Sequence, residues 1–441
     1  MPNIVVLGTQ WGDEGKGKVV DLIGPHVDVV ARYNGGNNAG HTVVVGREKY
    51  VLHTLPSGIL HPNCRNIIGC GVVIDPASLI GEMEGLVRRG VTLDGNLFIS
   101  RNAHLIMPYH PALDLASEAK LAARRIGTTG KGVGPAYVDK AARIGIRMAD
   151  LLDQRLFRDK LEFNVAQKNR ILREVYDAPT FNVDEILNPY LRFAGWLAPY
   201  ITDTALLLSK WIDNGYNVLF EGAQATMLDI DHGTYPYISS SSTTAGGAAT
   251  GTGVPPTKIN GVLGVSKAYT TRVGEGPFPT ELTGAVGELL RSRGNEYGST
   301  TGRPRRCGWF DAVVLRYAVR INGIDTVALT KLDVLDQCET VKICTGYRHE
   351  GDILTDFPVE ESVLQKAEPI YEELDGWMAS TTGAKIEADL PAKARQYLAR
   401  LEELTGVPFC MISTGPQRAE TIVTEASPLT RWYPGIGSNL D

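Results

Sequence analysis

Short apolar segments rich in β-branched residues alternate along this chain with longer segments of helical periodicity. Several of the apolar segments run directly into a glycine-containing or polar stretch, namely residues 3–8, 27–33, 217–222, 327–330 and 407–413. Helical periodicity is clearest at residues 150–163 and 391–404. The alternation predicts an α/β fold with a large, mostly parallel central sheet and flanking helices. Ligands bind beyond the carboxyl ends of such strands, which is where the polar stretches lie.

The composition predicts a globular protein whose partners are small molecules. The 441 residues include 44 Lys+Arg and 50 Asp+Glu, a net charge of −6, which argues against a nucleic-acid partner. No apolar run reaches the roughly 18 residues of a membrane span, so we expect no membrane contact and a cytoplasmic location. We expect one domain, residues 1–441, with a mainly helical subdomain at about 100–215. Residues 239–256, rich in Gly, Thr and Ser, fit either a flexible linker or a ligand-facing loop.

The first polar stretch, "TQWGDEGKGKVVD" at residues 9–21, has the spacing of a phosphate-binding loop from Gly12 to Lys18. Its backbone N–H groups and lysines would face phosphate oxygens at the start of a helix. Two features are unusual: Asp13 lies inside the loop, and Val19 stands where a Ser or Thr that binds magnesium is expected. Asp13 could satisfy the helix N-terminus, bind magnesium or take a proton from a substrate, and we favour the last two roles.

The second stretch, "NGGNNAGHT" at residues 34–42, is a polar loop in which His41 is the only titratable side chain. A lone histidine is usually structural or exposed. Because this loop follows a predicted strand and can face the phosphate loop, we interpret His41 as an acid or a stabiliser of charge.

The third stretch, "LTKLD" at residues 329–333, suggests guanine recognition. Asp333 can accept hydrogen bonds from both guanine N1–H and the exocyclic amine, which adenine cannot reproduce, and Lys331 would lie along the base. A solvated loop is the alternative. "ISTGP" at residues 412–416 ends another strand and could close over the same base.

The fourth stretch, "GSTTGRPRRCG" at residues 298–308, concentrates Arg303, Arg305 and Arg306 in one loop. Such a loop suits bidentate capture of carboxylate or phosphate, although a solvated basic face is the alternative. Cys307 follows the arginines, which could lower the pKa of its thiol; a small buried residue is the other interpretation.

Taken together, these residues predict a guanine-specific nucleotide triphosphatase with a second anion-binding loop, which describes a synthetase better than a hydrolase. A regulatory GTPase would need a Ser or Thr at position 19 and a D-x-x-G segment after a later strand. Val19 contradicts the first requirement, and the D-x-x-G at residues 21–24 lies in the helix after the loop. Nucleic-acid binding is suggested by the arginine cluster alone, and the net negative charge opposes it.

Seven stretches, in chain order, resemble the adenylosuccinate synthetase family: "QWGDEGKGK", "NGGNNAGHT", "GKGVGPAYVDKAARIG", "DIDHGTYPY", "STTGRPRR", "TKLDVLD" and "ISTGP". The resemblance runs from residue 3 to beyond residue 420. It implies a GTP-dependent carbon–nitrogen ligase that joins IMP and L-aspartate to adenylosuccinate, GDP and phosphate, the first committed step from IMP to AMP. GTP is then a co-substrate.

The resemblance also implies roles for residues of the site. Asp13 would remove the N1 proton of IMP, so that O6 attacks the γ-phosphate of GTP and forms 6-phosphoryl-IMP. His41 would stabilise charge in the transfer, and Gln224 completes the implied catalytic set. One Mg²⁺ per subunit would be held by Asp13 and the carbonyl of Gly40, which explains why Val19 is tolerated.

The binding residues implied by the resemblance fall into three sets. The GTP set is Gly12, Asp13, Glu14, Gly15, Lys16, Gly17, Lys18, Gly40, His41, Thr42, Arg305, Lys331, Leu332, Asp333, Ser413, Thr414 and Gly415. The IMP set is Asp13, Glu14, Gly15, Lys16, Asn38, Ala39, Gly40, His41, Thr129, Arg143, Gln224, Ser239 and Arg303. The aspartate set is Ser299, Thr300, Thr301, Gly302, Arg303, Pro304 and Arg305. Arg143 would reach in from a second subunit, which implies a homodimer.

The sequence departs from the family pattern at three positions. Ser239 stands where threonine is expected, which keeps the hydroxyl, and Ser242 stands where the family usually has asparagine. Pro304 interrupts what is often a run of arginines, which leaves Arg303 and Arg305 to bind the anion.

Overall fold

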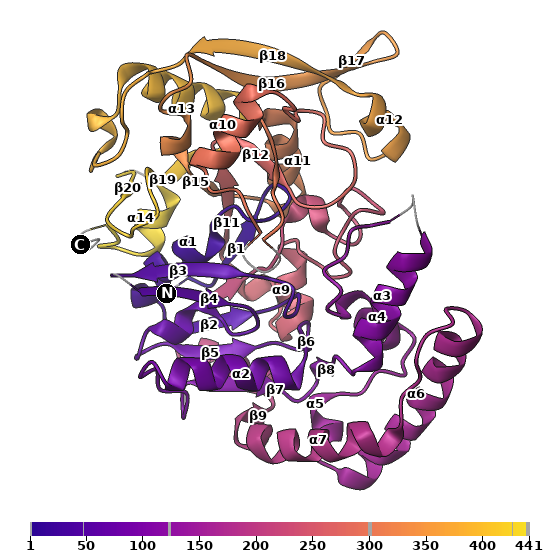
Figure 1. The fold of residues 1–441 in the computed structure, drawn as a ribbon. Coiled ribbons are helices and arrows are strands. Elements are labelled where there is room, and N and C mark those ends of the chain that lie inside the picture. Colours follow the sequence, from indigo (N-terminus) through magenta and orange to yellow (C-terminus); the bar gives the residue numbers. More distant parts are fainter. Residues whose placement is uncertain (1, 47, 122–124, 299–301, 426, 438–441) are drawn as a thin grey trace.

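The computed structural model describes residues 2–46, 48–121, 125–298, 302–425 and 427–437. A ten-stranded sheet runs through the middle of the molecule (Figure 1). In spatial order its strands are β20 (Thr421–Val423), β19 (Phe409–Ser413), β15 (Thr326–Thr330), β11 (Gly261–Lys267), β1 (Ile4–Gly8), β10 (Val218–Glu221), β2 (Val29–Arg32), β5 (Arg65–Ile68), β7 (Leu97–Ser100) and β9 (Ile201–Thr202). The apolar segments predicted to be strands are β1, β2, β10, β15 and β19 of this sheet.

The sheet is parallel except at one edge, where β20 runs antiparallel to β19. Strand β1 lies between β10 and β11, with Ile4 beside Leu219 on one side and Gly261 on the other. All residues of β1, β2, β10 and β15 are buried. Strands covered on both faces carry continuous apolar runs instead of alternation, which explains sequences such as "IVVLG". The predicted fold class is confirmed.

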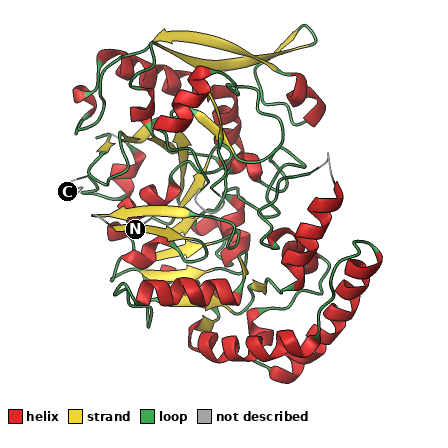
Figure 2. Cartoon of the chain, in the orientation of Figure 1, coloured by secondary structure: helices red, strands yellow, loops and turns green. Residues whose placement is uncertain are grey.

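Helices cover both faces of this sheet (Figure 2). Outside residues 100–200, the described helices of the chain are α1 (Lys16–Ile23), α2 (Pro76–Val87), α8 (Thr204–Asp213), α9 (Gly246–Thr252), α10 (Ala285–Arg293), α11 (Ala312–Asn322), α12 (Glu361–Lys366), α13 (Ala392–Thr405) and α14 (Pro428–Trp432). Local sequence fixes several helix starts. The carboxylates of Asp75 and Asp311 accept hydrogen bonds from the first free N–H groups of α2 and α11.

Five further helices lie between residues 109 and 197 and extend away from the sheet, at the lower right of Figure 1. They are α3 (Tyr109–Leu121), α4 (Val133–Ala141), α5 (Met148–Leu151), α6 (Gln154–Glu174) and α7 (Val183–Leu197). The apolar faces of α3, α5, α6 and α7 form a core with α2 and with strands β5 and β7, whereas Val133 and Ala136 of α4 pack against Val73 and Ile106. This segment is thus continuous with one end of the sheet. Whether it is a separate subdomain stays a prediction.

The remaining strands form small sheets around the large one. The pairs are β3 (His41–Val45) with β4 (Glu48–Leu52), β6 (Val73–Ile74) with β8 (His104–Leu105), and β12 (Thr270–Arg272) with β13 (Arg306–Gly308). A fourth sheet joins β14 (Phe310–Asp311), β16 (Thr340–His349), β17 (Asp352–Leu354) and β18 (Glu368–Asp375). Among the described residues, no helix has the length and apolarity to cross a membrane.

The Gly/Thr/Ser-rich stretch at residues 239–256 is packed against the body of the protein. It contains α9, and Ala248 in that helix is fully buried. The carboxylate of Asp229 accepts from the N–H groups of Thr243 and Thr244, at 2.6 and 3.1 Å. The flexible-linker alternative is therefore wrong.

Candidate active site

Five of the polar stretches singled out in the sequence follow the strands β19, β15, β1, β10 and β2, and β11 lies between β15 and β1 in the sheet. Because these strands are parallel, their carboxyl ends lie along one edge of the sheet. The phosphate loop follows β1, and the loop at residues 33–40 follows β2. The "KLD" and "TGP" segments follow β15 and β19. The fold thus brings segments more than 300 residues apart to one edge.

Glu14 is the buried member of the acidic pair in the phosphate loop. Its carboxylate accepts from the N–H groups of Gln10 and Gly12, at 3.1 and 2.8 Å. It also forms a 2.6 Å ion pair with Lys16, and both side chains are buried. Helix α1 begins at Lys16, after Gly15 in a left-handed conformation. Glu14 therefore holds the loop in shape and neutralises one of its lysines.

Asp13 is the accessible member of the pair. Its side chain is 31% exposed, and its Oδ2 accepts from Nε of Arg305 at 2.7 Å. Its φ of 61° is strained for a residue with a Cβ, and such strain concentrates at functional sites. Eight non-glycine residues of the described chain have a positive φ, and four of them are predicted site residues: Asp13, Arg143, Gln224 and Lys331.

His41 begins β3 and is buried against the phosphate helix. A Cβ added to Gly17 of α1 would lie 3.2 Å from the Cβ of His41, a tight contact that glycine avoids. Nδ1 of His41 bonds to the carboxylate of Glu221, the last residue of β10. That carboxylate also accepts from N and Oγ of Ser57, both at 2.7 Å. Glu221 is a site residue that the sequence analysis missed.

Burial sets the protonation of this pair. It lowers the pKa of His41, against the attraction of Glu221. Burial alone would raise the pKa of Glu221, but His41, the buried Arg32 and the Ser57 hydroxyl hold it below its usual value. The resting pair is therefore a neutral imidazole with its proton on Nδ1, donated to an ionised carboxylate. Nε2 is the ring nitrogen left for a ligand.

Three residues predicted to bind IMP lie in one chain of polar contacts. Nε2 of Gln224 donates to Oδ1 of Asn38 at 3.3 Å, and Asn34 donates to Oε1 of Gln224 at 3.4 Å. Asn34 also donates to Oγ of Ser241 at 3.1 Å, and Ser241 lies 3.3 Å from the hydroxyl of Ser239. Gln224, Asn38 and Ser239 are thus brought together beside the ends of β2 and β10.

Other predicted residues lie on exposed segments at the rim. Thr129 precedes α4 and Arg143 follows it, and both are exposed. Arg303 and Pro304 are exposed on the segment that leads to β13. Ser299, Thr300 and Thr301 lie outside the described residues.

Asp333 carries an unusual buried oxygen. Its Oδ1 is buried with no hydrogen-bond partner among the described residues, and burial raises its pKa. Oγ1 of Thr414, in the "TGP" segment, is likewise buried and without a described partner. Buried polar atoms in folded proteins are nearly always hydrogen-bonded, so each such atom requires an explanation. A base that presents N–H donors would supply the missing partner of Asp333.

Lys18 ties the phosphate helix to the "TGP" segment. Its Nζ donates to Oγ of Ser413 and to the carbonyl of Gly415, both at 2.7 Å, and to the carbonyl of Glu420 at 3.1 Å. Burial lowers the pKa of Lys18 to about 8. In this structure Lys18 therefore fixes the position of a loop on the guanine side.

Arg305 links the predicted aspartate loop to the phosphate loop. Nε donates to Asp13, and NH1 donates to Glu296 at 2.6 Å. The neighbouring Cys307 is buried, and burial raises the pKa of its thiol to about 11. The arginines therefore do not activate this cysteine.

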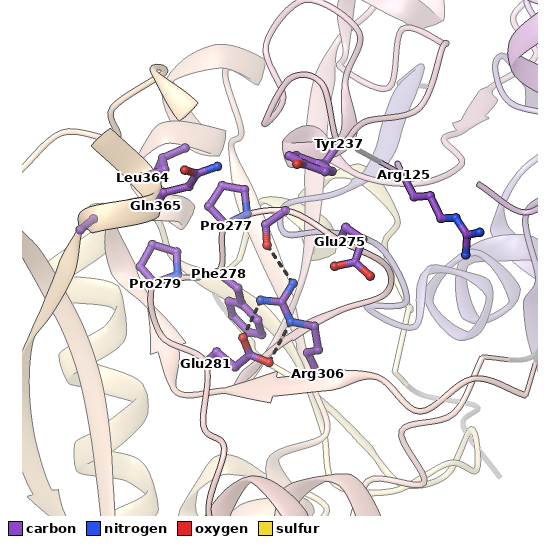
Figure 3. Close-up of a pocket in the computed structure, with 12 residues that line it drawn as sticks. Arg125, Tyr237, Glu275, Pro277, Phe278, Pro279, Glu281, Arg306, Leu364 and Gln365 are labelled. Atoms are coloured by element: carbon purple, nitrogen blue, oxygen red, sulfur yellow. Dashed lines mark hydrogen bonds and ion pairs between the residues drawn. The ribbon is translucent and has the colours of Figure 1, made fainter. Parts of the chain in front are cut away.

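A cavity of about 730 Å³ lies next to these loops. Figure 3 shows Arg306 directed at Glu281 and at the backbone beside Pro277, with Leu364 and Gln365 on the far wall. Arg306 of the arginine-rich stretch lines it, but none of the residues assigned to catalysis or to the binding of GTP, IMP, aspartate or metal does. The cavity adjoins the edge of the sheet because Phe278 contacts Trp11 of the phosphate loop, with ring centroids 5.6 Å apart. We place the chemistry at the strand ends, where the strained and unpartnered groups lie.

The chain matches known proteins over almost its whole length. The family model for adenylosuccinate synthetase matches residues 5–422. The adenylosuccinate synthetase of Heliobacterium modesticaldum is 56% identical over 422 residues, 96% of this chain and 99% of the relative. That of Geotalea daltonii is 55% identical over 424 residues, 96% of this chain and 98% of the relative.

A solved structure shares the fold in detail. The fully ligated adenylosuccinate synthetase from Plasmodium falciparum superimposes with a TM-score of 0.92 at 40% identity, covering 96% of this chain and all of that one. The chain therefore belongs to the adenylosuccinate synthetase family, the GTP-dependent ligases that join IMP and L-aspartate to give adenylosuccinate.

Proposed function

We propose that the sheet edge described above is where this ligase works, and that the reaction passes through 6-phosphoryl-IMP with Asp13 as the base. The main support is the position of Asp13: a strained, accessible carboxylate in the phosphate loop, hydrogen-bonded to Arg305. Glu14 supports the same assignment, because it already neutralises Lys16 and leaves Asp13 available to a substrate.

The first chemical step removes a proton and transfers a phosphoryl group. Asp13 takes the N1 proton of IMP, O6 forms a bond to the γ-phosphorus of GTP, and GDP leaves. A free Asp, with a pKa of about 3.9, is a weak base, so the developing O6 charge must be stabilised. His41 acts here as the imidazolium: it takes up a second proton beside the phosphates, Glu221 accepts from Nδ1–H, and the protonated Nε2 donates to a phosphoryl oxygen.

The second step replaces the phosphate by the amine of L-aspartate. The amine attacks C6 of the purine and loses a proton to water, and the C6–O6 bond breaks so that inorganic phosphate leaves with its electron pair. A phosphate ester leaves far more easily than an oxo group, which explains why the first step is needed. Arg303 and Arg305 are the proposed grip on the aspartate carboxylates. Gln224 and Asn38, joined by a hydrogen bond, are proposed to hold the purine or its ribose.

We also propose that one Mg²⁺ per subunit is held by Asp13 and the carbonyl of Gly40. The described residues contain no group of three or more His, Cys, Asp or Glu side chains suited to a metal. Mg²⁺ fits this donor set, because it is usually held by one or two carboxylates together with substrate phosphates and water. When bound, it would neutralise charge on the phosphates.

A homodimer completes the proposal. Arg143 is exposed after α4, and we propose that it reaches the IMP site of a partner subunit. We keep the expectation of a cytoplasmic location, in line with the metabolites that the family uses.

The first test follows phosphate release from GTP in the presence of magnesium. We expect release only when IMP and L-aspartate are both present, with a change in purine absorbance. Asp13→Ala should abolish product formation and leave the melting temperature nearly unchanged. Asp177→Ala is the matched control, because Asp177 also has a positive φ, of 50°, but lies between α6 and α7. Substantial turnover by Asp13→Ala would remove Asp13 as the base, and release from GTP alone would favour a GTPase.

A further inference from the structure

Glu296 lies after α10, fully buried, with four partners from three segments. Its carboxylate accepts from Nζ of Lys267, at 2.8 and 2.9 Å to its two oxygens, and from the hydroxyl of Tyr269. It also accepts from NH1 of Arg305 at 2.6 Å and lies 3.3 Å from Nζ of Lys331. A glutamate in such a position is either a counter-charge for the buried Lys267 or a junction between the other two cations.

The geometry favours the junction. The backbone N–H of Arg305 donates to the carbonyl of Glu296 at 2.9 Å, so these two residues close the neck of the predicted aspartate loop. Lys331 of the guanine motif also donates to the carbonyl of Gly294, two residues before Glu296. Lys331 therefore contacts both the side chain of Glu296 and the backbone of Gly294, just before the neck. A direct path of contacts runs from Lys331 through Glu296 and Arg305 to Asp13.

The charge balance supports the same conclusion. The cluster contains three cations, Lys267, Lys331 and Arg305, and two carboxylates, Glu296 and Asp13, which leaves one positive charge in excess. Burial alone would raise the pKa of Glu296, but the three cations lower it, so Glu296 is ionised. When Asp13 turns to a substrate proton, Glu296 is the remaining carboxylate contact of Arg305. The excess charge then suits an anionic substrate.

We propose that Glu296 is a positioning residue that couples occupancy of the guanine site to the placement of Arg305, and so to the binding of L-aspartate. A ligand that orders Lys331 fixes the neck held by Glu296, and the neck fixes Arg305. Because such coupling is reciprocal, L-aspartate should tighten guanine nucleotide binding by the same factor. This inference rests on the proposed roles of Lys331 in guanine recognition and of Arg305 in aspartate binding.

Lys331→Met gives the cleanest test, because the Lys331 side chain is about one third exposed and its loss should be tolerated. The KM for L-aspartate is measured at saturating GTP and IMP. Coupling predicts that it rises about tenfold, a usual size for coupling between sites. If the KM for GTP rises and the KM for L-aspartate does not, the coupling is refuted while guanine recognition stands. If neither KM changes, Lys331 has no role in guanine recognition, and the coupling through it is refuted as well.

Glu296→Gln tests the junction itself. We expect both KM values to rise about tenfold and the effect of GDP on the affinity for an unreactive aspartate analogue to disappear. Glu281→Gln is the matched control, because Glu281 pairs with Arg306, the neighbour of Arg305, and forms no hydrogen bond or ion pair with this cluster among the described residues. It should leave both values within about twofold. A Glu296→Gln enzyme that folds and keeps the GDP effect would overturn the proposal.

Discussion

Two carboxylates at the same edge of the sheet differ in their hydrogen bonding and in the direction of their pKa shifts. Glu221, at the end of β10, has a neutral histidine and both polar groups of Ser57 as partners, and its pKa is lowered. Asp333, just after β15, keeps a buried oxygen with no partner among the described residues, and its pKa is raised. Both carboxylates lie at or just beyond the end of a buried apolar strand, so the strand context does not explain the difference. Their neighbours do.

The difference separates catalysis from recognition. A carboxylate whose hydrogen bonds are all satisfied within the protein can hold another residue in position before any substrate arrives. One that is left without a partner gains its hydrogen bond only when the correct ligand binds, and a ligand without the donor leaves it unpaired. We infer that Glu221 acts on turnover through His41 and that Asp333 acts on nucleotide choice.

Removing the charge of Glu221 should have the largest effect. Glu221→Gln keeps the shape of the side chain but no longer fixes the imidazole as a carboxylate does. We expect kcat to fall about 10²- to 10⁴-fold, the range for loss of positioned acid–base assistance, with little change in the KM for GTP. Steady-state kinetics check this. Asp311→Asn is the control, a fully buried carboxylate that caps α11, and it should leave kcat unchanged.

If Glu221→Gln raised the KM for GTP and left kcat unchanged, Glu221 would act in nucleotide binding. The inferred difference between Glu221 and Asp333 would then be wrong. A melting curve accompanies the kinetics, because the fully buried Arg32 loses a nearby negative charge in this variant.

Asp333→Asn should have the second largest effect, and on a different quantity. The amide can still accept one hydrogen bond but presents its own N–H₂ to the base. We expect kcat/KM for GTP to fall about 10²-fold, kcat at saturation to stay close to normal, and the preference for GTP over ITP and ATP to shrink. Competition between the three nucleotides measures this. An unchanged preference would remove Asp333 from guanine recognition.

The sequence predicted one half of this contrast better than the other. The spacing "TKLD" directs attention to Asp333, because the pattern is local. Glu221 is visible as a charge at the end of an apolar segment, yet its partner His41 lies 180 residues away, and no local pattern pairs them. The same holds for Glu296, which lies in an undistinguished segment and becomes a junction through Lys267 and Arg305.

The fold was predictable for a related reason. Buried parallel strands read as continuous apolar runs, so β1, β2, β10, β15 and β19 could be located from sequence. Composition misled only where residues 239–256 could pass for a linker. That segment is held in place by hydrogen bonds to Asp229, and composition does not reveal such a tertiary contact.

The pH dependence gives a third, smaller effect that sharpens the comparison. Burial raises the pKa of Asp333, so on acidification this group takes up a proton before Glu221 does, whose pKa is lowered. Guanine needs the ionised acceptor, so GTP binding releases that proton. The KM for GTP should therefore rise as the pH falls, by at most about tenfold per unit, before kcat changes. Asp333→Asn should remove this rise, and a rise that persists in the variant must come from another group.

The smallest effect should come from Ser413, which holds the loop opposite Asp333. Lys18 donates to Ser413 and to two backbone carbonyls, so Ser413→Ala leaves two of its three acceptors. Losing one hydrogen bond among three should raise the KM for GTP about threefold, without changing the GTP-to-ATP preference. Ser427→Ala, a buried serine that bonds to Thr424, is the control. A change of thirtyfold or more would mean that Ser413 contacts the nucleotide itself, and recognition on this side would then depend on two partnerless groups and the serine together.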